Sequence, residues 1–356
     1  MHFRQIDFEK VRWDDIELSP DCNFFQTKAW IEFLSTTQKA SPVIAVLEDD
    51  STTLGYFVGL RVRRFCVPIL ASPMPGWTTP YIGFNLKPGV ARCQALVALR
   101  TFAFHELGCW HLEIADPAIT EEDARCAGFL ATVKMSYATD LTLPEDALLH
   151  KLHKMIRGNL RKAQRSGVQI AEANDLAFAD EYYDQLKDVF AKQGLIPTYP
   201  LERIRELIKR LLPTGRLLLL RALDPAGRCI ATDICFGMGE VAFIFGNASY
   251  RTGQHLRPNQ ALHWYAFRYW KARGAKVFDW VGGSTYKEKY AAVPSFYVTC
   301  RASRVPLLEA LRTTARWGYR MRQVVSGRLH LHPPNPECPE NERPESSHEP
   351  EELVSH

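Results

Sequence analysis

The sequence predicts a mixed α/β (α+β) protein in which one kind of domain, a mixed sheet flanked by helices, occurs twice. The first observation is a repeated pattern. Gln94-Ala95-Leu96 is followed after eleven residues by Gly108. Gln260-Ala261-Leu262 is followed after eleven residues by Gly274. Glycine is typical of the end of a helix. The two patterns are 166 residues apart, which is too far for a solenoid repeat and close to one domain length.

The second and third observations concern what surrounds each predicted helix. An acid lies five residues beyond each glycine, Glu113 in the first copy and Asp279 in the second. A two-stranded unit with a polar turn precedes each helix, at residues 43–64 and 217–239. Chance could produce one matching tripeptide and glycine, but the matching strand pairs and acids favour the duplication of a domain.

The elements of the first copy are predicted from residue 24 onward. The segment FFQTKAWIEFLSTT has the apolar spacing of an amphipathic helix. After it we expect two or three strands between 42 and 70, a helix at 90–107, a strand at 109–115 and a smaller strand pair around 129–141.

A loop rich in proline and glycine, SPMPGWTTPYIGFNLKPG, interrupts this copy. We expect Trp77, Thr78, Thr79 and Tyr81 to be exposed on it, with Trp77 and Tyr81 as candidate substrate contacts, because loops of this length are often functional. The alternative is a connector whose aromatic side chains pack on the core.

A basic segment joins the two copies. Pro144 is followed by two acids, which favour a helix start. Residues 151–165 hold six Lys or Arg and no acid, and Arg157, Arg161 and Arg165 recur every four residues. Like charges at this spacing oppose helix formation, so we predict that the three arginines bind a phosphate-bearing substrate. A solvated surface helix is the alternative.

In the second copy we expect helices at 182–190 and 201–212 and strands at 217–223, 230–237 and 241–246. The polar, basic segment NASYRTGQHLRPNQ then leads into a helix that begins at Pro258. The free N–H groups of a helix N-terminus favour anions. We therefore predict a cofactor site here, formed by four residues: Arg251, Gly253, His255 and Arg257.

The segment from Pro258 to Tyr290 predicts a helix, a strand, a glycine loop and a pair of lysines. Apolar residues recur at a spacing of three to four up to Gly274, and 277–281 is an apolar run with one acid, which is typical of a buried strand with a polar side chain near its end. Gly282-Gly283 follows and is assigned to the cofactor site.

The composition fits a globular chain with two cores, with 46% hydrophobic and 24% charged residues among 356. There is no apolar run of eighteen residues and no signal pattern at the N-terminus, so we expect a cytoplasmic protein. The nine cysteines include no C-x-x-C pair, and most should be reduced core residues.

The net charge of +4 is unevenly distributed along the chain. Residues 333–356 hold seven Glu and one Arg, a balance of −6, so the preceding 332 residues carry +10. We expect this acidic tail to be disordered. Residues 306–332 predict a basic amphipathic helix, suited to an anionic membrane surface or to packing on the body of the protein. The predicted domains are thus 1–143 and 144–305, followed by that helix and the tail.

Three motifs carry a resemblance to a known family. RGNLRKAQRSGV at the join, RPNQALHWYAFRYWKARGAKVFDWVGG and YKEKYA together resemble the FemAB-like branch of the GNAT acyltransferase superfamily, including its BioF2-like acetyltransferase domains. The resemblance covers 145–305 firmly and 20–140 more weakly. It implies tandem GNAT domains that transfer an acyl or aminoacyl group to an amine or hydroxyl, often on cell-wall or exopolysaccharide precursors, from acyl-CoA or aminoacyl-tRNA.

The resemblance also implies catalytic residues. Such proteins carry a lysine behind an aromatic residue after the glycine loop, which matches Tyr286-Lys287, with Lys289 as the other register. A fixed cation stabilises the oxyanion of aminolysis, so Lys287 is the candidate for that role and Tyr286 a candidate substrate contact. Asp279 could orient the nucleophile, pair with the lysine or merely end a strand.

His263 and Tyr265, on the helix that begins at Pro258, are candidates for the general base or acid. For each of them core packing is the alternative.

The sequence differs from acetyl-CoA-binding members of the superfamily in the turn that would bind the donor. Acetyl-CoA-binding members place several glycines in the turn before the helix, whereas here Gly253 stands alone in RTGQHLRP. We keep acyl-CoA as the first donor and aminoacyl-tRNA, which the basic helix would suit, as the second. The acceptor would be a phosphate-bearing or lipid-linked glycan, with peripheral membrane contact possible.

No zinc spacing, Walker loop or serine elbow competes with the transferase interpretation, and we expect no metal. A protein of another class, a non-catalytic binder of nucleic acid or anionic lipid built on the same scaffold, is the alternative to the enzyme. If the protein is an enzyme, replacing Lys287 with Met should abolish transfer and spare binding. If it is a binder, the replacement should matter little.

Overall fold

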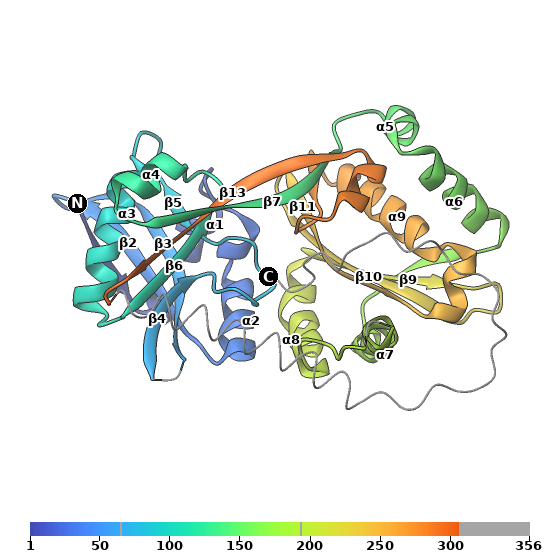
Figure 1. Cartoon of the computed structure of the whole chain (residues 1–356), viewed down its shortest axis with the longest axis horizontal. Coiled ribbons are helices and arrows are strands. Elements are labelled where there is room, and N and C mark those ends of the chain that lie inside the picture. Colours follow the sequence, from blue (N-terminus) through green and yellow to red (C-terminus); the bar gives the residue numbers. More distant parts are fainter. Residues whose placement is uncertain (65, 193, 306–356) are drawn as a thin grey trace.

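The computed structural model describes residues 1–64, 66–192 and 194–305. Within them the strands form one mixed, thirteen-stranded sheet in the order β1-β2-β3-β4-β6-β13-β7-β12-β11-β10-β9-β8, with β5 paired to β3. Two helix-flanked halves lie side by side along this sheet (Figure 1). The predicted α/β (α+β) fold is confirmed. The predictions for 306–332 and 333–356 lie outside the described residues.

The first half contains the N-terminal strands and helices. Its elements are β1 His2–Ile6, η1 Phe8–Lys10, α1 Trp13–Glu17, η2 Phe24–Gln26, α2 Lys28–Gln38, β2 Ser41–Asp49, β3 Thr52–Arg64, β4 Val67–Ser72, β5 Phe84–Leu86, α3 Arg92–Thr101, the π-helical turn η3 Phe102–Glu106, β6 His111–Asp116, α4 Glu121–Cys126 and β7 Leu130–Asp140.

The second half begins with the two helices of the join. Its elements are α5 Glu145–Lys151, α6 Lys154–Arg165, β8 Gln169–Ala173, α7 Ala177–Ala191, α8 Leu201–Leu211, η4 Leu212–Thr214, β9 Leu217–Leu223, β10 Cys229–Met238, β11 Val241–Ser249, η5 Arg251–Leu256, α9 Pro258–Ala272, β12 Val277–Asp279, η6 Thr285–Tyr290 and β13 Ala292–Ser303.

Two long strands connect the halves. β13 pairs with β7 from Ala292 to Arg301, and its last residues also pair with β6 of the first half. The end of β7 in turn pairs with β12 of the second half. The expected strand pair around 129–141 is wrong, because β7 is one continuous strand whose partner comes from the far end of the chain. The boundary at 143/144 stays a prediction, since β7 and β13 serve both halves.

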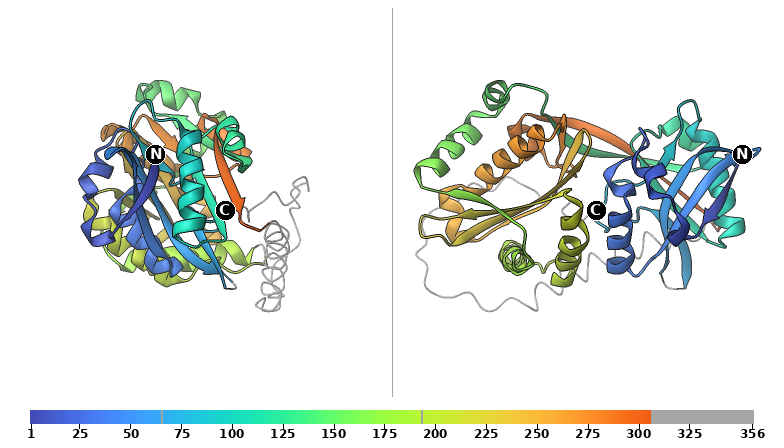
Figure 2. Two further views of the ribbon diagram at one scale, coloured as in Figure 1. Left: turned by 90° about the vertical axis from the view of Figure 1, so that its left-hand side faces the viewer. Right: turned by 180° about the vertical axis from the view of Figure 1, so that it is seen from behind.

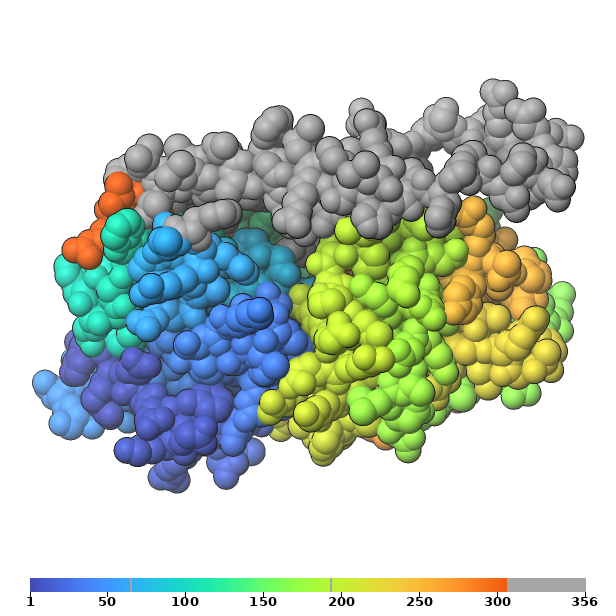
Figure 3. Space-filling view, turned by 90° about the horizontal axis from the view of Figure 1, so that it is seen from below, coloured from blue at the N-terminus to red at the C-terminus, as the bar shows by residue number. Residues whose placement is uncertain are grey.

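Helices cover both faces of the sheet. α2, α7 and α8 lie on one face, where Trp30, Tyr182 and Ile208 belong to a single apolar core that continues through both halves. On the other face α3 and α4 cover the first half, and α5, α6 and α9 cover the second, each over its own core. Figure 2 shows the same layers from the side and from behind. The halves meet closely where α2 packs against α8, and the space-filling view shows these segments in contact (Figure 3).

The sequence repeat corresponds to a structural repeat. The third residue after each helix-ending glycine is His111 in the first half and Val277 in the second. His111 pairs in parallel with β4, and Val277 pairs in parallel with β11. Glu113 and Asp279 therefore occupy the same register, opposite Ala71 and Phe243 respectively.

The basic segment of the join is not one helix. The backbone is extended at Leu152 and His153, so the segment divides into α5 and α6. No helix among the described residues is long and apolar enough to cross a membrane, and the eight cysteines in the described ranges are free.

Candidate functional site at the divergence of β11 and β12

The two parallel strands of the second half pair only briefly. β11 and β12 pair at Val241–Phe243 and Val277–Asp279, after which β11 continues to Ser249 whereas β12 ends. The chain turns away through Val281, with φ of 46°, and Gly282, with φ of 98°. Ligands of α/β proteins bind where parallel strands end and diverge. The divergence beyond Asp279 is therefore the candidate site.

Asp279 ends β12 and lies at the centre of this divergence. Its Oδ1 accepts hydrogen bonds from the Ser136 hydroxyl at 2.6 Å and from the Val281 N–H at 2.8 Å. Burial raises the pKa of this carboxyl, and these hydrogen bonds and the Lys287 ammonium act against the rise. A carboxylate of raised pKa is a better proton acceptor than an exposed one, which suits a general base.

Lys287 holds the bend that follows Asp279. Its Nζ donates hydrogen bonds to the carbonyl oxygens of Val281 at 2.9 Å and Gly282 at 2.7 Å. Desolvation lowers its pKa to about 8, although the nearby Asp279 carboxylate favours the charged form. An ammonium has three N–H donors, so one remains for a ligand when the other two bind the loop.

Aromatic side chains of both halves line the same region. The Tyr81 ring contacts the rings of Phe243 and Tyr297, at centroid distances of 6.4 and 5.6 Å. Burial, with the Asp279 charge as a smaller cause, raises the pKa of the Tyr297 phenol to about 12 and that of Tyr81 well above its ordinary value. Both hydroxyls thus stay protonated and can donate hydrogen bonds near the acid.

The prediction of an exposed loop at 72–89 is wrong for its aromatic and polar candidates. Trp77, Thr79 and Tyr81 are all buried. The carbonyl of Trp77 accepts a hydrogen bond from the buried guanidinium of Arg203 in α8, so the loop is held between the halves. The alternative of packing on the core describes Trp77, whereas Tyr81 is both buried and close to Asp279.

A groove of about 360 Å³ lies farther along β11. Four residues of extended strand, about 13 Å, separate its first β11 residue, Asn247, from Phe243, which pairs with Asp279. The start of α9 borders the groove and has no side-chain cap, so its first N–H groups are free to bind an anion. The lining residues are Val189, Lys192, Asn247, Ala248, Ser249, Gln254 and Asn259.

The predicted cofactor residues around η5 differ in their surroundings. Arg251, His255 and Arg257 are exposed beside the start of α9. Gly253 is buried, and a Cβ added to it would lie 2.7 Å from Cβ of Ile230. The glycine is therefore required by packing against β10, and its surroundings do not form the open phosphate cradle that a glycine-rich turn provides. The uncapped start of α9 is thus suited to bind the phosphates of acyl-CoA, whereas Gly253 is not.

The two candidates on α9 are separated from Asp279. His263 is buried, its Nδ1 lies 3.1 Å from Asp233 of β10, and its ring packs on Trp280. The Tyr265 hydroxyl donates a hydrogen bond to Glu172 on β8, the last strand of the sheet. Neither position brings the side chain to the divergence of β11 and β12.

Tyr286 lies on η6, above the start of α9. Its hydroxyl accepts a hydrogen bond from Gln260 at 3.2 Å, and its side chain is 43% exposed. The Lys289 ammonium lies 4.9 Å from the centre of its ring. Lys287 thus points into the bend, whereas Lys289, the other register, stays on the surface over Tyr286.

The three arginines of α6 do not act as one set. Arg157 donates hydrogen bonds to the carbonyls of His150 and Leu152, so it caps the end of α5. Arg161 and Arg165 are exposed. The start of α6 lies next to η6, because the His153 N–H donates to the Lys289 carbonyl at 2.9 Å.

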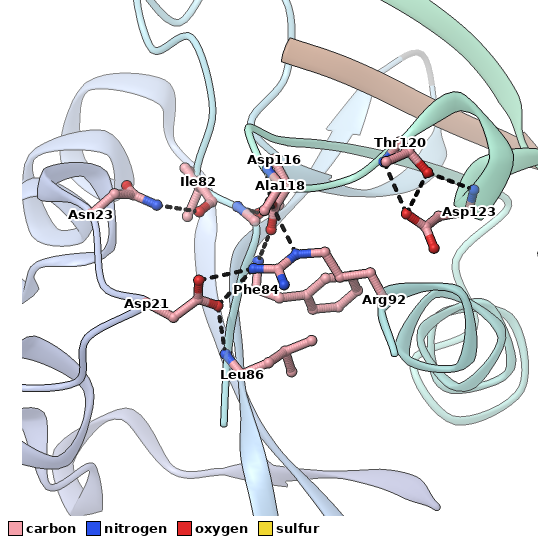
Figure 4. Close-up of polar contacts among 12 residues, drawn as sticks. Asp21, Asn23, Ile82, Phe84, Leu86, Arg92, Asp116, Ala118, Thr120 and Asp123 are labelled. Carbon is pink, nitrogen blue, oxygen red and sulfur yellow. Dashed lines mark hydrogen bonds and ion pairs between the residues drawn. The ribbon is translucent and has the colours of Figure 1, made fainter. Parts of the chain in front are cut away.

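The equivalent place in the first half is filled by the protein's own carboxylates. Arg92, the first residue of α3, bonds to Asp21 at 2.8 Å and lies 3.5 Å from Asp116 (Figure 4). Asp116 also accepts from Phe84 N–H. Glu113, in the register of Asp279, is fully buried and pairs with His111 at 3.0 Å. An anionic donor would meet these carboxylates, so the second half is the better candidate for chemistry.

Sequence reasoning did not find Ser136, Tyr297, Phe243 or Gln260. Ser136 and Tyr297 reach the site only because β7 and β13 pair across the halves. Their positions carry no local signal, since the hydrogen bond from Ser136 to Asp279 joins residues 143 apart in sequence.

Comparison with known proteins identifies the region that carries this site. Residues 150–290 match the family described as an acetyltransferase (GNAT) domain. The match lies within the second half, which is therefore similar to a GNAT acetyltransferase domain. None of the curated proteins compared with the chain matches it.

Solved structures agree with a GNAT fold over most of the chain. The crystal structure of FemX aligns with a TM-score of 0.67 at 14% identity, covering 84% of this chain and 97% of FemX. L-PGS from Bacillus licheniformis aligns with a TM-score of 0.52 at 11% identity, covering 82% of this chain and 96% of L-PGS. A tandem GNAT protein from the clavulanic acid biosynthesis pathway aligns with a TM-score of 0.51 at 10% identity, covering 86% of this chain and 99% of that protein.

These likenesses agree with the tandem GNAT-like fold that the sequence motifs predicted. At such low identities they bear on the fold alone. Among the described residues no group of three His, Cys, Asp or Glu could hold a metal ion.

Proposed function

We propose that this protein is an acyltransferase whose reaction takes place where β11 and β12 diverge in the GNAT domain. The observation that carries the proposal is the placement of Asp279 and Lys287. A buried carboxylate of raised pKa and a partly buried ammonium face the same bend. A general base and an oxyanion-stabilising cation are what acyl transfer to an amine or hydroxyl requires.

In this reaction Asp279 accepts a proton from the acceptor amine or hydroxyl as that atom attacks the acyl carbon. The remaining N–H of Lys287 donates to the oxyanion that forms, because its two other donors hold Val281 and Gly282. The buried phenols of Tyr81 and Tyr297 exclude water and border the acceptor. As the carbonyl re-forms, the bond between the acyl carbon and the donor sulfur or oxygen breaks, and the donor leaves as a thiol or hydroxyl with the proton that Asp279 had accepted.

For the donor, we propose acyl-CoA first. The groove beside β11 and the uncapped start of α9 support it, because free N–H groups at a helix start bind phosphate. Aminoacyl-tRNA is the second candidate. The exposed cations of α6, which lie next to η6, support it, since neutralised phosphates supply most non-specific affinity for nucleic acid. The resemblance of the motifs favours a cell-envelope or exopolysaccharide precursor as acceptor.

The decisive experiment measures thermal stabilisation of the full chain by acyl-CoAs, free CoA, charged and uncharged tRNA, and polyprenyl-phosphate glycans at fixed low salt. A ligand at about 100 times its Kd adds about 2.7 kcal/mol to the free energy of unfolding. A shift with an acyl-CoA identifies the first donor, and a shift with charged tRNA alone identifies the second.

Equal shifts with any polyanion, together with no transfer and no effect of Lys287→Met, would contradict the proposal. They would instead favour the non-catalytic binder.

A further inference from the structure

An apolar patch lies open on the two strands that connect the halves. Phe296 of β13 is 61% exposed and pairs across the strands with Met135 of β7. Val133 is 44% exposed and Pro294 is exposed as well. Paired residues and residues two apart share one face of a sheet, so these side chains form a single surface. We call it the ribbon patch: Val133, Met135, Pro294 and Phe296.

The ribbon patch contacts the glycine loop that follows Asp279. A Cβ added to Gly283 would lie 3.3 Å from Cε of Met135, so the patch touches the loop between Asp279 and Lys287. It faces the same side of the sheet as α4, α6 and α9, because its cross-strand neighbours Tyr137 and Val298 belong to the cores under those helices. β7 and β13 run as a pair between the helices of the two halves (Figure 1).

The cations of α6 lie on this same side. Four of them are exposed, and none forms an ion pair with another described residue. α8 is different, because its Arg205 and Arg210 pair with Asp180 and Glu206. Like charges four residues apart destabilise the helix, so an external anion on this face would stabilise it. The four are Lys154, Arg161, Lys162 and Arg165.

We propose that this side of the protein docks on a bilayer surface that contains anionic phospholipid. The apolar side chains of the ribbon patch enter the boundary between headgroups and acyl chains, while the α6 cations bind the headgroups. The patch is too small for a stable interface with a second copy, which takes about 20–30 residues a side. Phe296 is its one aromatic side chain, whereas binding of single-stranded nucleic acid uses several aromatic platforms on which successive bases stack.

This docking would bring the loop between Asp279 and Lys287 to the membrane surface, whereas the Asp279 carboxylate, with Ser136 and Tyr297, faces the other side of the sheet. Its test is separate from catalysis, because vesicle binding is measured without any donor and without any transfer. A failure of the docking would therefore leave the proposed function untouched.

The test is flotation of the full chain with vesicles of phosphatidylcholine alone and of phosphatidylcholine with about 30% phosphatidylglycerol at 0.1 M salt. We expect binding to the anionic vesicles only. Phe296→Asp and Met135→Asp should each weaken it at least about tenfold. The pair Arg161→Gln and Arg165→Gln should weaken it about 25-fold, or about fivefold for each cation.

Leu176→Asp is the matched control. Leu176 is 53% exposed at the start of α7, on the other side of the sheet, and its replacement adds the same charge without changing binding. Unchanged binding by Phe296→Asp and Met135→Asp would overturn the proposal and assign any membrane contact to residues 306–332. Two other results would also overturn the proposal. One is a dimer that Phe296→Asp separates into monomers, and the other is vesicle binding that competing RNA abolishes but Phe296→Asp does not change.

Discussion

Ser136 of β7 donates a hydrogen bond of 2.6 Å to Asp279 of β12, so that a strand shared by the two halves holds the acid of the GNAT domain. This hydrogen bond favours the charged carboxylate and limits the rise of its pKa. The pKa of Asp279 in the second half thus depends on a residue contributed by the first.

Ser136→Ala should raise the pKa of Asp279 further, because the carboxylate loses a donor while its burial stays. The acid limb of the pH–rate profile should move to higher pH, and the free energy of unfolding at neutral pH should fall by about 2 kcal/mol. Ser295→Ala is the control, since Ser295 pairs with Ser136 across the strands and belongs to the same ribbon. An identical profile for the two variants would argue against Asp279 as the base.

Lys287→Met should reduce the rate of transfer by about 10²–10³ while leaving donor binding within a few-fold. The reason is that the proposed oxyanion donor is lost, whereas the groove and the start of α9 are unchanged. Lys289→Met removes a surface cation over Tyr286 and should retain most activity. Single-turnover rates and donor Kd values separate the two effects, and a stronger loss in Lys289→Met would show that the other register is correct.

The low pKa of Lys287 predicts two pH dependences. Activity should fall as pH rises through about 8, where the ammonium loses its proton. The stability contribution has the opposite sign: the unfolded lysine titrates near 10.5 and the folded one near 8, so between these values the unfolded state binds more protons. Stability from this group therefore rises with pH from 8 to 10.5 and is lost as pH falls through 8.

Urea unfolding of the wild type and Lys287→Met between pH 7 and 10.5 checks this sign. The difference in the free energy of unfolding between the two proteins should move in favour of the wild type as pH rises. A difference that is flat across this range would mean that the lysine is not desolvated in the folded protein.

Gly253→Ala should destabilise the protein by about 1–3 kcal/mol through overpacking against Ile230. The double variant with Ile230→Val should recover much of this loss, because the added methyl then meets a smaller neighbour. Donor affinity, measured on the folded fraction, should change little. A large loss of affinity without a loss of stability would show instead that Gly253 approaches the phosphates of the donor.

Arg92→Met should destabilise the first half by about 3 kcal/mol, because Asp116 is buried and would lose its cation. Burial already raises the pKa of Asp116, with Arg92 as the main opposing influence. Adding Asp116→Asn should restore part of the stability. Donor binding by the GNAT domain should stay unchanged in both variants, and a loss of it would mean that the first half binds the donor too.

Much of the fold follows from local signals in the sequence. The glycines at 108 and 274, with the acids five residues beyond, lie in the same register in both halves. The reason is that a parallel strand that follows a helix must begin at a similar distance from the end of that helix. The apolar periodicity of α9 and the strands β9 to β11 were predicted within a few residues. The aromatic–lysine pair, read through its resemblance, led to Lys287.

What local signals did not predict depends on contacts between distant residues. The long pairing of β7 with β13 was missed because a strand does not specify its partner, and burial of Trp77 and Tyr81 was missed because their cover comes from the other half. The packing role of Gly253 and the capping role of Arg157 likewise became visible only with their neighbours in place.

The sequence by itself determined the duplicated α/β architecture, the basic join and the family resemblance, since these depend on spacing and on residue type. Only the tertiary structure decided that Ser136, Tyr81 and Tyr297 gather around Asp279, and that carboxylates fill the equivalent place in the first half. The physical reason is that burial, pKa and hydrogen bonding at this site arise between strands and loops far apart in the chain.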